Sequence, residues 1–220
     1  MEPSLWQLIA VYSLPVILAI TLHEAAHAFV ASRLGDSTAR SLGRVTLNPL
    51  KHVDPVGTLL VPALILLASR AFGFPLLFGW AKPVPIIASN LRSPRRDMGL
   101  VAAAGPGANL LMALAWAFVY KLAPILAFAQ EYLEMMAVGG IVVNVALAVL
   151  NMMPVPPLDG GRIVASLLPP RLATSYSRLE PFGLFILLAL LATGLLGSVV
   201  MPIILFAVGA LSSAFSLNLF

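Results

Sequence analysis

Long runs without a charged residue dominate the pattern of hydrophobic and polar positions along the chain. One run begins at Pro3 and continues through a single polar cluster to Ser32, and two others cover Met98–Tyr120 and Met135–Leu158. Each is long enough for a membrane-spanning helix, which needs about 20 apolar residues. Apolar residues follow one another instead of alternating with polar ones, which argues against a β-barrel. The pattern predicts an all-α polytopic membrane protein.

Two further apolar runs are less regular. The run over residues 181–220 is too long for one span, and Gly194 and Pro202 lie where a break would divide it into two helices. Pro55–Ala81 is interrupted by Arg70. It either crosses the membrane twice or forms a short re-entrant or β-hairpin-like segment near residues 55–90. We therefore expect about six transmembrane helices.

Composition supports this prediction. Of the 220 residues, 60% are hydrophobic and 10% are charged, whereas soluble domains have about 45–50% and about 25%. A soluble globular enzyme is excluded, and the length leaves room for a single integral-membrane domain over residues 1–220. Because the chain has no cysteine, any metal would have to be held by His, Asp or Glu.

The few charges predict an orientation. Residues 33–51, 82–97 and 162–180 carry an excess of Lys and Arg, whereas residues 121–134 do not. Basic loops remain in the cytoplasm, so we expect the N-terminus outside, in a cell membrane typical of a prokaryotic plasma membrane. Since these loops account for the net charge of +4, we expect the lipid bilayer and no nucleic acid as a partner.

A polar cluster interrupts the first predicted helix. His23, Glu24 and His27 form an H-E-x-x-H motif. Positions four residues apart share a helix face, so both imidazoles can reach one metal ion, and the glutamate can act as general base towards water. Ionisable residues within an apolar span are costly, which favours a functional reading over a structural one.

A catalytic zinc ion takes three protein ligands and leaves one position for water. The remaining candidates for the third ligand are His52, Asp36, Asp54, Asp97, Glu131, Glu134 and Asp159. His27 lies six residues before the cytoplasmic Arg33, about 9 Å along a helix, so the two glutamates of the outer loop are excluded. Asp159 follows an apolar run directly and reaches the same depth, while the other candidates stay open.

The surroundings of Asp159 suit a ligand. Three prolines in the sequence Pro154-Val-Pro156-Pro157-Leu158 end the preceding helix, and Gly160 and Gly161 would let the backbone turn beside a bound ion. Irregular backbone at membrane depth is tolerated where it lines a protected cavity.

The H-E-x-x-H motif in the first helix and the pattern N-x-x-P-x-P-x-L-D-G-G over residues 151–161 together resemble the site-2 protease family of intramembrane zinc metalloproteases. Asn48–Pro55, Gly79–Pro85 and Arg95–Asp97 resemble segments of its short bacterial and archaeal branch, and Gly105-Pro106 with Asn109 resembles another family element. No loop could hold an inserted PDZ domain, and no appended nucleotide-sensing domain is expected.

The resemblance implies roles for matching residues. His23, His27 and Asp159 would hold one zinc ion per chain, Glu24 would be the general base, and Asn151 would lie near the substrate carbonyl. It also implies a catalytic core over about residues 5–165. The C-terminal helical pair over about residues 181–220 is predicted from the long apolar run alone and carries no family-specific signal.

Three of the polar residues have alternative readings. Asn151 could cap its helix or bond to a neighbouring helix. Asn144, seven residues earlier on the same helix face, could take part directly or bond between helices. His52 could be a second catalytic or gating group, or a solvated loop residue.

The implied function is hydrolysis of peptide bonds within transmembrane segments of other membrane proteins, in regulated intramembrane proteolysis, with the active site towards the cytoplasm. An unwound substrate could pair with an edge near residues 72–90 by strand addition. The alternatives are a membrane metal transporter and a non-catalytic protein that binds membrane segments. The sequence does not indicate an oligomeric state.

Overall fold

The computed structural model describes residues 5–60 and 82–217, and the regular structure in these two ranges is helical. The longer helices are α1 (Leu5–Arg33), α4 (Pro94–Leu122), α5 (Gln130–Asn151), α6 (Asp159–Leu167), α7 (Pro170–Ser177), α8 (Gly183–Ala192) and α9 (Leu195–Phe215). The connections hold the short helix α2 (Thr38–Ser41) and single turns of 3-10 or π-helix at Pro49–Lys51, Pro55–Leu60, Ala88–Asn90, Ala123–Ile125, Ala127–Ala129 and Glu180–Phe182. The predicted all-α class is confirmed.

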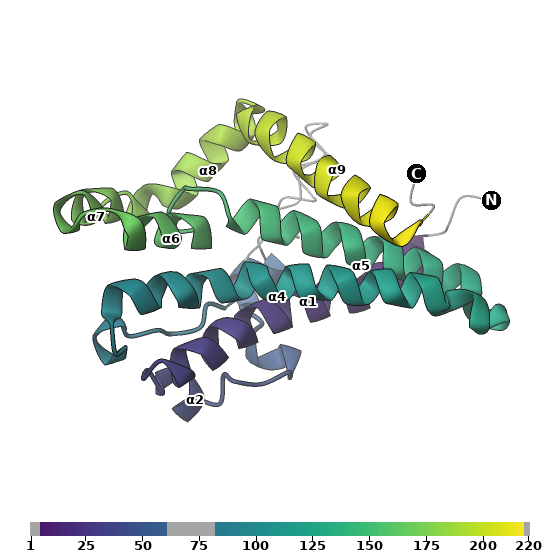
Figure 1. Ribbon diagram of the computed structural model, residues 1–220, viewed down its shortest axis with the longest axis horizontal. Coiled ribbons are helices and arrows are strands. Elements are labelled where there is room, and N and C mark those ends of the chain that lie inside the picture. Colours follow the sequence, from purple (N-terminus) through teal and green to yellow (C-terminus); the bar gives the residue numbers. More distant parts are fainter. Residues whose placement is uncertain (1–4, 61–81, 218–220) are drawn as a thin grey trace.

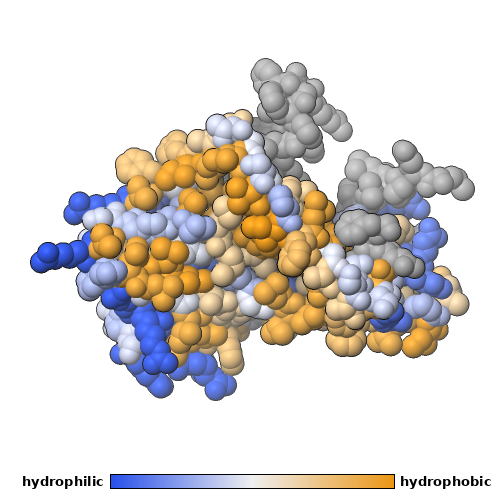
Figure 2. All heavy atoms as spheres, turned by 45° about the horizontal axis from the view of Figure 1, so that its top comes forward, coloured by the Kyte–Doolittle hydropathy of each residue, from blue (hydrophilic) through white to orange (hydrophobic). Residues whose placement is uncertain are grey.

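Within the described residues, five helical stretches are long and apolar enough to cross a membrane: Ala10–Arg33, Pro94–Ile125, Ala127–Asn151, Pro170–Ala192 and Leu195–Phe215. Hydrophobic residues form a broad band between two more hydrophilic ends of the molecule (Figure 2). Large apolar side chains such as Leu111 on α4 and Phe206 on α9 are exposed. Exposed apolar surface of this extent is typical of a protein whose helices face lipid.

The helices α1, α4 and α5 pack against one another and form the centre of the fold (Figure 1). Small residues bring them close together, because a Cβ atom on Gly139 would meet the ring of Tyr12 and one on Gly140 would meet Trp116. Trp116 belongs to the largest apolar core, to which α9 contributes Val208. Close approach at small residues is typical of membrane helices, which gain little from burying apolar surface against lipid.

The helices α8 and α9 divide the long apolar run near the C-terminus. The break falls at Gly194, whose φ of 72° is left-handed and carries no steric cost for glycine. Pro202, the other candidate for the break, lies inside α9. Helix α9 packs on α5 (Figure 1).

The segment near residues 55–90 is described only at its two ends. Pro55–Leu60 forms a turn of π-helix, and residues 82–87 have no regular secondary structure and lead into the 3-10 turn Ala88–Asn90. These two ends contain no strand pairing. The predicted hairpin turn or second crossing falls on residues 61–81, outside the described residues.

Candidate metal centre

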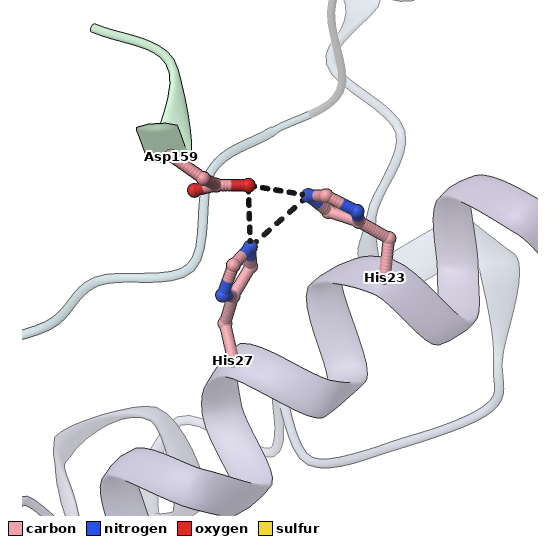
Figure 3. Close-up of side chains that lie close together, drawn as sticks. All are labelled: His23, His27 and Asp159. Carbon is pink, nitrogen blue, oxygen red and sulfur yellow. Dashed lines mark hydrogen bonds and ion pairs between the residues drawn. The ribbon is translucent and has the colours of Figure 1, made fainter. Parts of the chain in front are cut away.

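Two histidines and one aspartate meet between α1 and α6. His23 and His27 lie one turn apart on α1, and both are buried. Their Nε2 atoms are 3.0 Å apart and point towards Asp159, the buried first residue of α6 (Figure 3). The Oδ2 atom of Asp159 lies 3.1 Å from Nε2 of His23 and 3.4 Å from Nε2 of His27. The fold thus brings together the three residues that the resemblance implied as ligands.

The spacing of these three atoms suits a tetrahedral zinc site. Zinc binds imidazole nitrogen and carboxylate oxygen at about 2.0–2.2 Å, which places the ligand atoms of a tetrahedron about 3.3–3.6 Å apart. The observed separations of 3.0, 3.1 and 3.4 Å are close to this range. Oδ2 of Asp159 is also buried without a hydrogen-bond donor, which is costly unless a cation lies beside it. The donor set therefore fits zinc.

A backbone carbonyl determines the tautomer of His27. Its Nδ1 atom lies 2.7 Å from the carbonyl oxygen of Val101 on α4. A carbonyl can only accept, so Nδ1 carries the proton and donates it. The Nε2 atom then has a free lone pair directed at the centre, as a metal-ligating histidine requires.

An asparagine does the same for His23. Nδ1 of His23 lies 2.6 Å from Oδ1 of Asn109 on α4. The amide nitrogen of Asn109 donates to the carbonyl of Ala19 at 3.1 Å and to Oδ1 of Asn144 at 2.9 Å. Because the carbonyl of Ala19 can only accept, the amide must direct its oxygen to His23. Nδ1 of His23 is therefore the donor, and its Nε2 is also free for a metal ion.

Helix α4 passes the centre at a glycine. A Cβ atom on Gly105 would fall on the Nε2 atoms of both His23 and His27. Only a residue without a side chain leaves room there for the imidazoles and an ion between them. The helix continues through the following residue, Pro106.

The glycines after Asp159 have a different role from the predicted one. Gly160 and Gly161 lie in the first turn of α6 and not in a turn of the backbone. A Cβ atom on Gly160 would meet the backbone of Met152, and one on Gly161 would meet the backbone of Pro156. The two glycines allow the start of α6 to lie directly on the chain that leaves α5, which positions Asp159.

The general-base candidate, Glu24, accepts a hydrogen bond from the segment that precedes α4. Glu24 is half-buried, and its Oε2 atom accepts a hydrogen bond of 3.0 Å from the backbone N–H of Val84. Val84 belongs to the irregular segment of residues 82–87, which we call the strap. The strap therefore lies within hydrogen-bond reach of the H-E-x-x-H motif.

Most N–H groups of the strap are engaged within the protein. Lys82 donates to the carbonyl of His52 at 2.9 Å, Val84 to Glu24, and Ile87 to Asp36 at 2.6 Å. The two prolines of the strap have no N–H. Within the strap, Ile86 is the residue whose N–H has no such partner, so the strap has a single N–H available for the predicted strand addition. The remainder of the predicted edge, residues 72–81, is outside the described residues.

The other candidate residues lie apart from the three ligands. Asn144 is buried and bonds to Asn109 and to the carbonyl of Gly140, two hydrogen bonds away from His23. The amide of Asn151 donates back to the carbonyl of Leu147 within α5 at 3.0 Å. The bond between Asn109 and Asn144 joins two helices, as in the structural alternative for Asn144, whereas the bond of Asn151 remains within its own helix.

His52 is buried and not solvated. Its Nε2 atom donates to the carbonyl of Thr46 at 3.0 Å, and its Nδ1 atom is buried without a partner. It touches the strap through its backbone, which accepts from Lys82. The structure places it beside the strap and not among the three ligands.

The other aspartates that were candidates for the third ligand accept hydrogen bonds in backbone turns and at the start of a helix. Asp54 accepts from the N–H groups of the two residues around the start of its helical turn, and Asp97 accepts from the N–H of Ser93 at the start of α4. Asp36 is fully buried and accepts from Thr38, Asn90 and the N–H of Ile87. Burial alone would raise the pKa of Asp36, but these hydrogen bonds outweigh it and lower the pKa below its ordinary value.

Sequence reasoning did not assign roles to Asn109, Gly105 or Val84. Asn109 and Gly105 were visible only as parts of a family-like element, and nothing in their spacing says that they face the histidines. A polar residue in an apolar span was the available signal for Asn109. Val84 acts through its backbone, so its side chain carries no signal of its role.

Comparison with known proteins points the same way. The model of "Peptidase family M50" matches residues 121–194, which include Asp159 but not the H-E-x-x-H motif. The chain is 38% identical over 196 residues to YwhC of Bacillus subtilis, named as a proposed zinc metalloprotease; the match covers 86% of this chain and 83% of that protein. No solved structure matches the chain significantly.

Two mycobacterial proteins, both named Rip2 and described as proposed zinc metalloproteases, are also similar. The one from Mycolicibacterium smegmatis is 32% identical, over 80% of this chain and 64% of its own length. The one from Mycobacterium tuberculosis H37Rv is 30% identical, over 79% and 63%. This chain thus spans somewhat less than two thirds of the mycobacterial relatives but most of YwhC. The match to YwhC over most of both chains, together with the family match, shows that the chain belongs to peptidase family M50, the site-2 protease family of intramembrane zinc metalloproteases.

Proposed function

We propose that the chain hydrolyses peptide bonds within transmembrane segments of other membrane proteins, with one zinc ion held by His23, His27 and Asp159. One observation carries this proposal: ligand atoms of these three buried residues lie within 4.8 Å of one another, in a chain whose described residues include five helical stretches long and apolar enough to span a membrane. The residue between the histidines in the motif is a glutamate, as in metalloproteases.

The residues of the site divide the work of hydrolysis. Zinc bound there would polarise the scissile carbonyl and lower the pKa of water towards about 7. Glu24 takes the proton of the attacking water and passes it to the leaving amine. Asn109 and the carbonyl of Val101 keep the two imidazoles oriented with their Nε2 atoms inwards.

The substrate is a membrane-spanning segment that is locally unwound. Helical hydrogen bonds occupy the carbonyl groups of an intact transmembrane helix, so the bond to be cut must first become extended. The site is buried among α1, α4 and α6. The extended stretch of the substrate must therefore reach the site from one side of these three helices.

We place the active site towards the cytoplasm and the N-terminus outside. Arg33 ends α1, and α2, α6 and α7, from the basic stretches of the sequence, lie at one end of the molecule together with the start of α4 (Figure 1). The positive-inside rule assigns this end to the cytoplasm. Since His27 lies about 9 Å before Arg33, we expect cleavage in the cytoplasmic third of the substrate span.

The two alternatives gain no support. A metal transporter needs polar groups distributed along a path through the membrane. Here His23, His27 and Asp159 gather around one point, and the other buried acidic side chains among the described residues, Asp36 and Asp97, accept hydrogen bonds from backbone N–H groups beside the end of α1 and at the start of α4. A protein that only binds membrane segments has no need of a glutamate in the metalloprotease arrangement.

The test combines zinc content with cleavage of a model transmembrane substrate in liposomes, for the unchanged protein, Glu24→Gln and Asp159→Asn. We expect one zinc per chain and cleavage for the unchanged protein. Glu24→Gln should keep the zinc and lose cleavage by about 10²–10⁴-fold, and Asp159→Asn should lose both.

Three outcomes would contradict the proposal. Full zinc content and activity in Asp159→Asn would remove Asp159 from the ligand set. Full activity in Glu24→Gln would remove the general base. Uptake of zinc into liposomes by Glu24→Gln, without any cleavage by the unchanged protein, would favour the transporter. Mass spectrometry of the cleaved substrate tests the predicted depth.

A further inference from the structure

Arg44 is a buried cation with no acidic partner among the described residues. Its side chain lies in the connection after α2, where Gly43 takes a left-handed φ of 65° and the N–H of Arg44 bonds to the carbonyl of Ala39. The residue is only 6% exposed, and its Nε atom has no hydrogen-bond partner. Burying a charge is costly unless it makes strong hydrogen bonds, so its remaining contacts should explain why it is there.

Those contacts are made with the strap. The Nη2 atom of Arg44 donates to the carbonyl of Lys82 at 2.7 Å and, over a longer 3.4 Å, to that of Pro83. The short distance to Lys82 is typical of a charge-assisted hydrogen bond. A guanidinium that is always charged is thus directed at two consecutive carbonyl groups.

The same peptide unit connects Arg44 to the general-base candidate. The carbonyl of Pro83 and the N–H of Val84 belong to one peptide group, and in a trans peptide they point in opposite directions. The carbonyl faces Arg44, and the N–H donates to Oε2 of Glu24 at 3.0 Å. A cation at the carbonyl end also polarises the N–H and strengthens its hydrogen bond.

Other contacts hold the strap without directing this peptide group. On one side of this peptide group, the N–H of Lys82 donates to the carbonyl of His52. On the other side, the N–H of Ile87 donates to Asp36. The side chain of Val84 packs with Ala28 of α1 and Ala39 of α2. These contacts keep the strap near α1, while Arg44 is the one described side chain that binds the carbonyl groups of Lys82 and Pro83.

We propose that Arg44 is a positioning residue that holds the Pro83–Val84 peptide group so that its N–H orients the carboxylate of Glu24. This inference rests on the proposed function, in which Glu24 moves the proton. No hydrogen bond or ion pair among the described residues joins Arg44 to His23, His27 or Asp159. The role of Arg44 is therefore confined to the geometry of the general base.

The experiment compares Arg44→Met and Arg44→Lys with Arg40→Met, a matched control that removes an exposed basic residue from the adjacent helix α2. For Arg44→Met we expect kcat to fall by about 10–100-fold, the size of effect that a misplaced catalytic group produces. KM, zinc content and the visible spectrum of the cobalt-substituted enzyme should match those of Arg40→Met. Arg44→Lys should recover part of kcat, because an ammonium group can also donate to a carbonyl.

A second pair of variants guards against misfolding of the Arg44 variants. Val84→Pro removes the N–H that binds Glu24 while leaving Arg44 in place, and Ile86→Pro removes an N–H of the same strap that has no described partner. We expect the loss of kcat in Val84→Pro and not in Ile86→Pro, with full zinc content in both.

The outcomes separate this inference from the proposed function. A kcat for Arg44→Met within about twofold of the Arg40→Met value, well below the expected range, would overturn the role of Arg44. So would a loss of zinc or a changed cobalt spectrum that accompanies the loss of kcat. If Glu24→Gln is fully active, the proposed function itself fails, and the role of Arg44 fails with it.

Discussion

The Nδ1 atom of His23 donates to the amide oxygen of Asn109 across 2.6 Å, although 86 residues separate the two in the chain. This bond joins the face of α1 that carries the two histidines to α4. It continues through Asn109 to Asn144 on α5. The orientation of one ligand therefore depends on all three central helices.

Replacing Asn109 should weaken zinc binding without removing a ligand. In Asn109→Ala the imidazole of His23 loses the acceptor that determines its tautomer, and such outer partners are worth about 10–100-fold in metal affinity. Competition with a chelator of known affinity measures the change. Asn144→Ala, one hydrogen bond further away, should have a smaller effect. An unchanged zinc affinity in Asn109→Ala would contradict the assigned role.

Gly105→Ala should eliminate the metal site. The added methyl group would fall on Nε2 of both histidines, so we expect loss of zinc and of cleavage together. Gly107→Ala in the same helix is the matched control, because no atom lies within 4 Å of a Cβ built on Gly107. It should keep zinc and stabilise the helix by up to about 1 kcal/mol. Zinc binding by Gly105→Ala at the unchanged level would show that the site is wider than described.

Replacing Asn151 distinguishes between a catalytic and a structural role of its amide. If its amide stabilises the oxyanion, Asn151→Ala should lower kcat by about 10²–10³-fold with zinc content unchanged. Its amide must then leave the carbonyl of Leu147, to which it is bonded in the structure. If the amide serves only to make this bond within α5, Asn151→Ala leaves kcat unchanged and lowers the midpoint temperature of thermal unfolding. Parallel measurement of kcat, zinc content and the midpoint separates the two cases.

Asp36 should make the stability of the region around α2 depend on pH. Hydrogen bonds from Thr38, Ile87 and Asn90 lower its folded-state pKa, so its carboxylate stabilises the fold above the unfolded-state pKa of about 3.9. This contribution is lost as pH falls through the lower, folded-state pKa. We expect Asp36→Asn to cost on the order of 1–3 kcal/mol at pH 7, and the difference from the unchanged protein to shrink as the pH falls below about 4.

Denaturant unfolding in detergent at pH 7 and pH 3 measures this difference. Glu131→Gln, which changes an exposed carboxylate in the first turn of α5, is the control and should differ little from the unchanged protein at either pH. A cost of Asp36→Asn that is equal at both pH values would mean that the charge of Asp36 does not contribute.

The sequence by itself determined the class of the protein and the chemistry of its centre. Long charge-free runs form helices in a membrane, because a helix pairs every backbone N–H and C=O group within the segment. The spacing of His23 and His27 follows from the same helical period, which puts both on one face. The clustering of basic residues predicts which end faces the cytoplasm.

Tertiary structure decided how the centre is built and held. No sequence period connects Asp159 with α1. Its position depends on Gly160 and Gly161, which let the start of α6 pack directly against the chain that leaves α5. The partners of the histidines, Asn109 and the carbonyl of Val101, come from α4, and helix packing alone brings them within reach. Glu24 is bound by a backbone N–H, a group that every residue except proline carries. Side-chain identity cannot reveal such a contact, so it becomes visible only when the chain is folded.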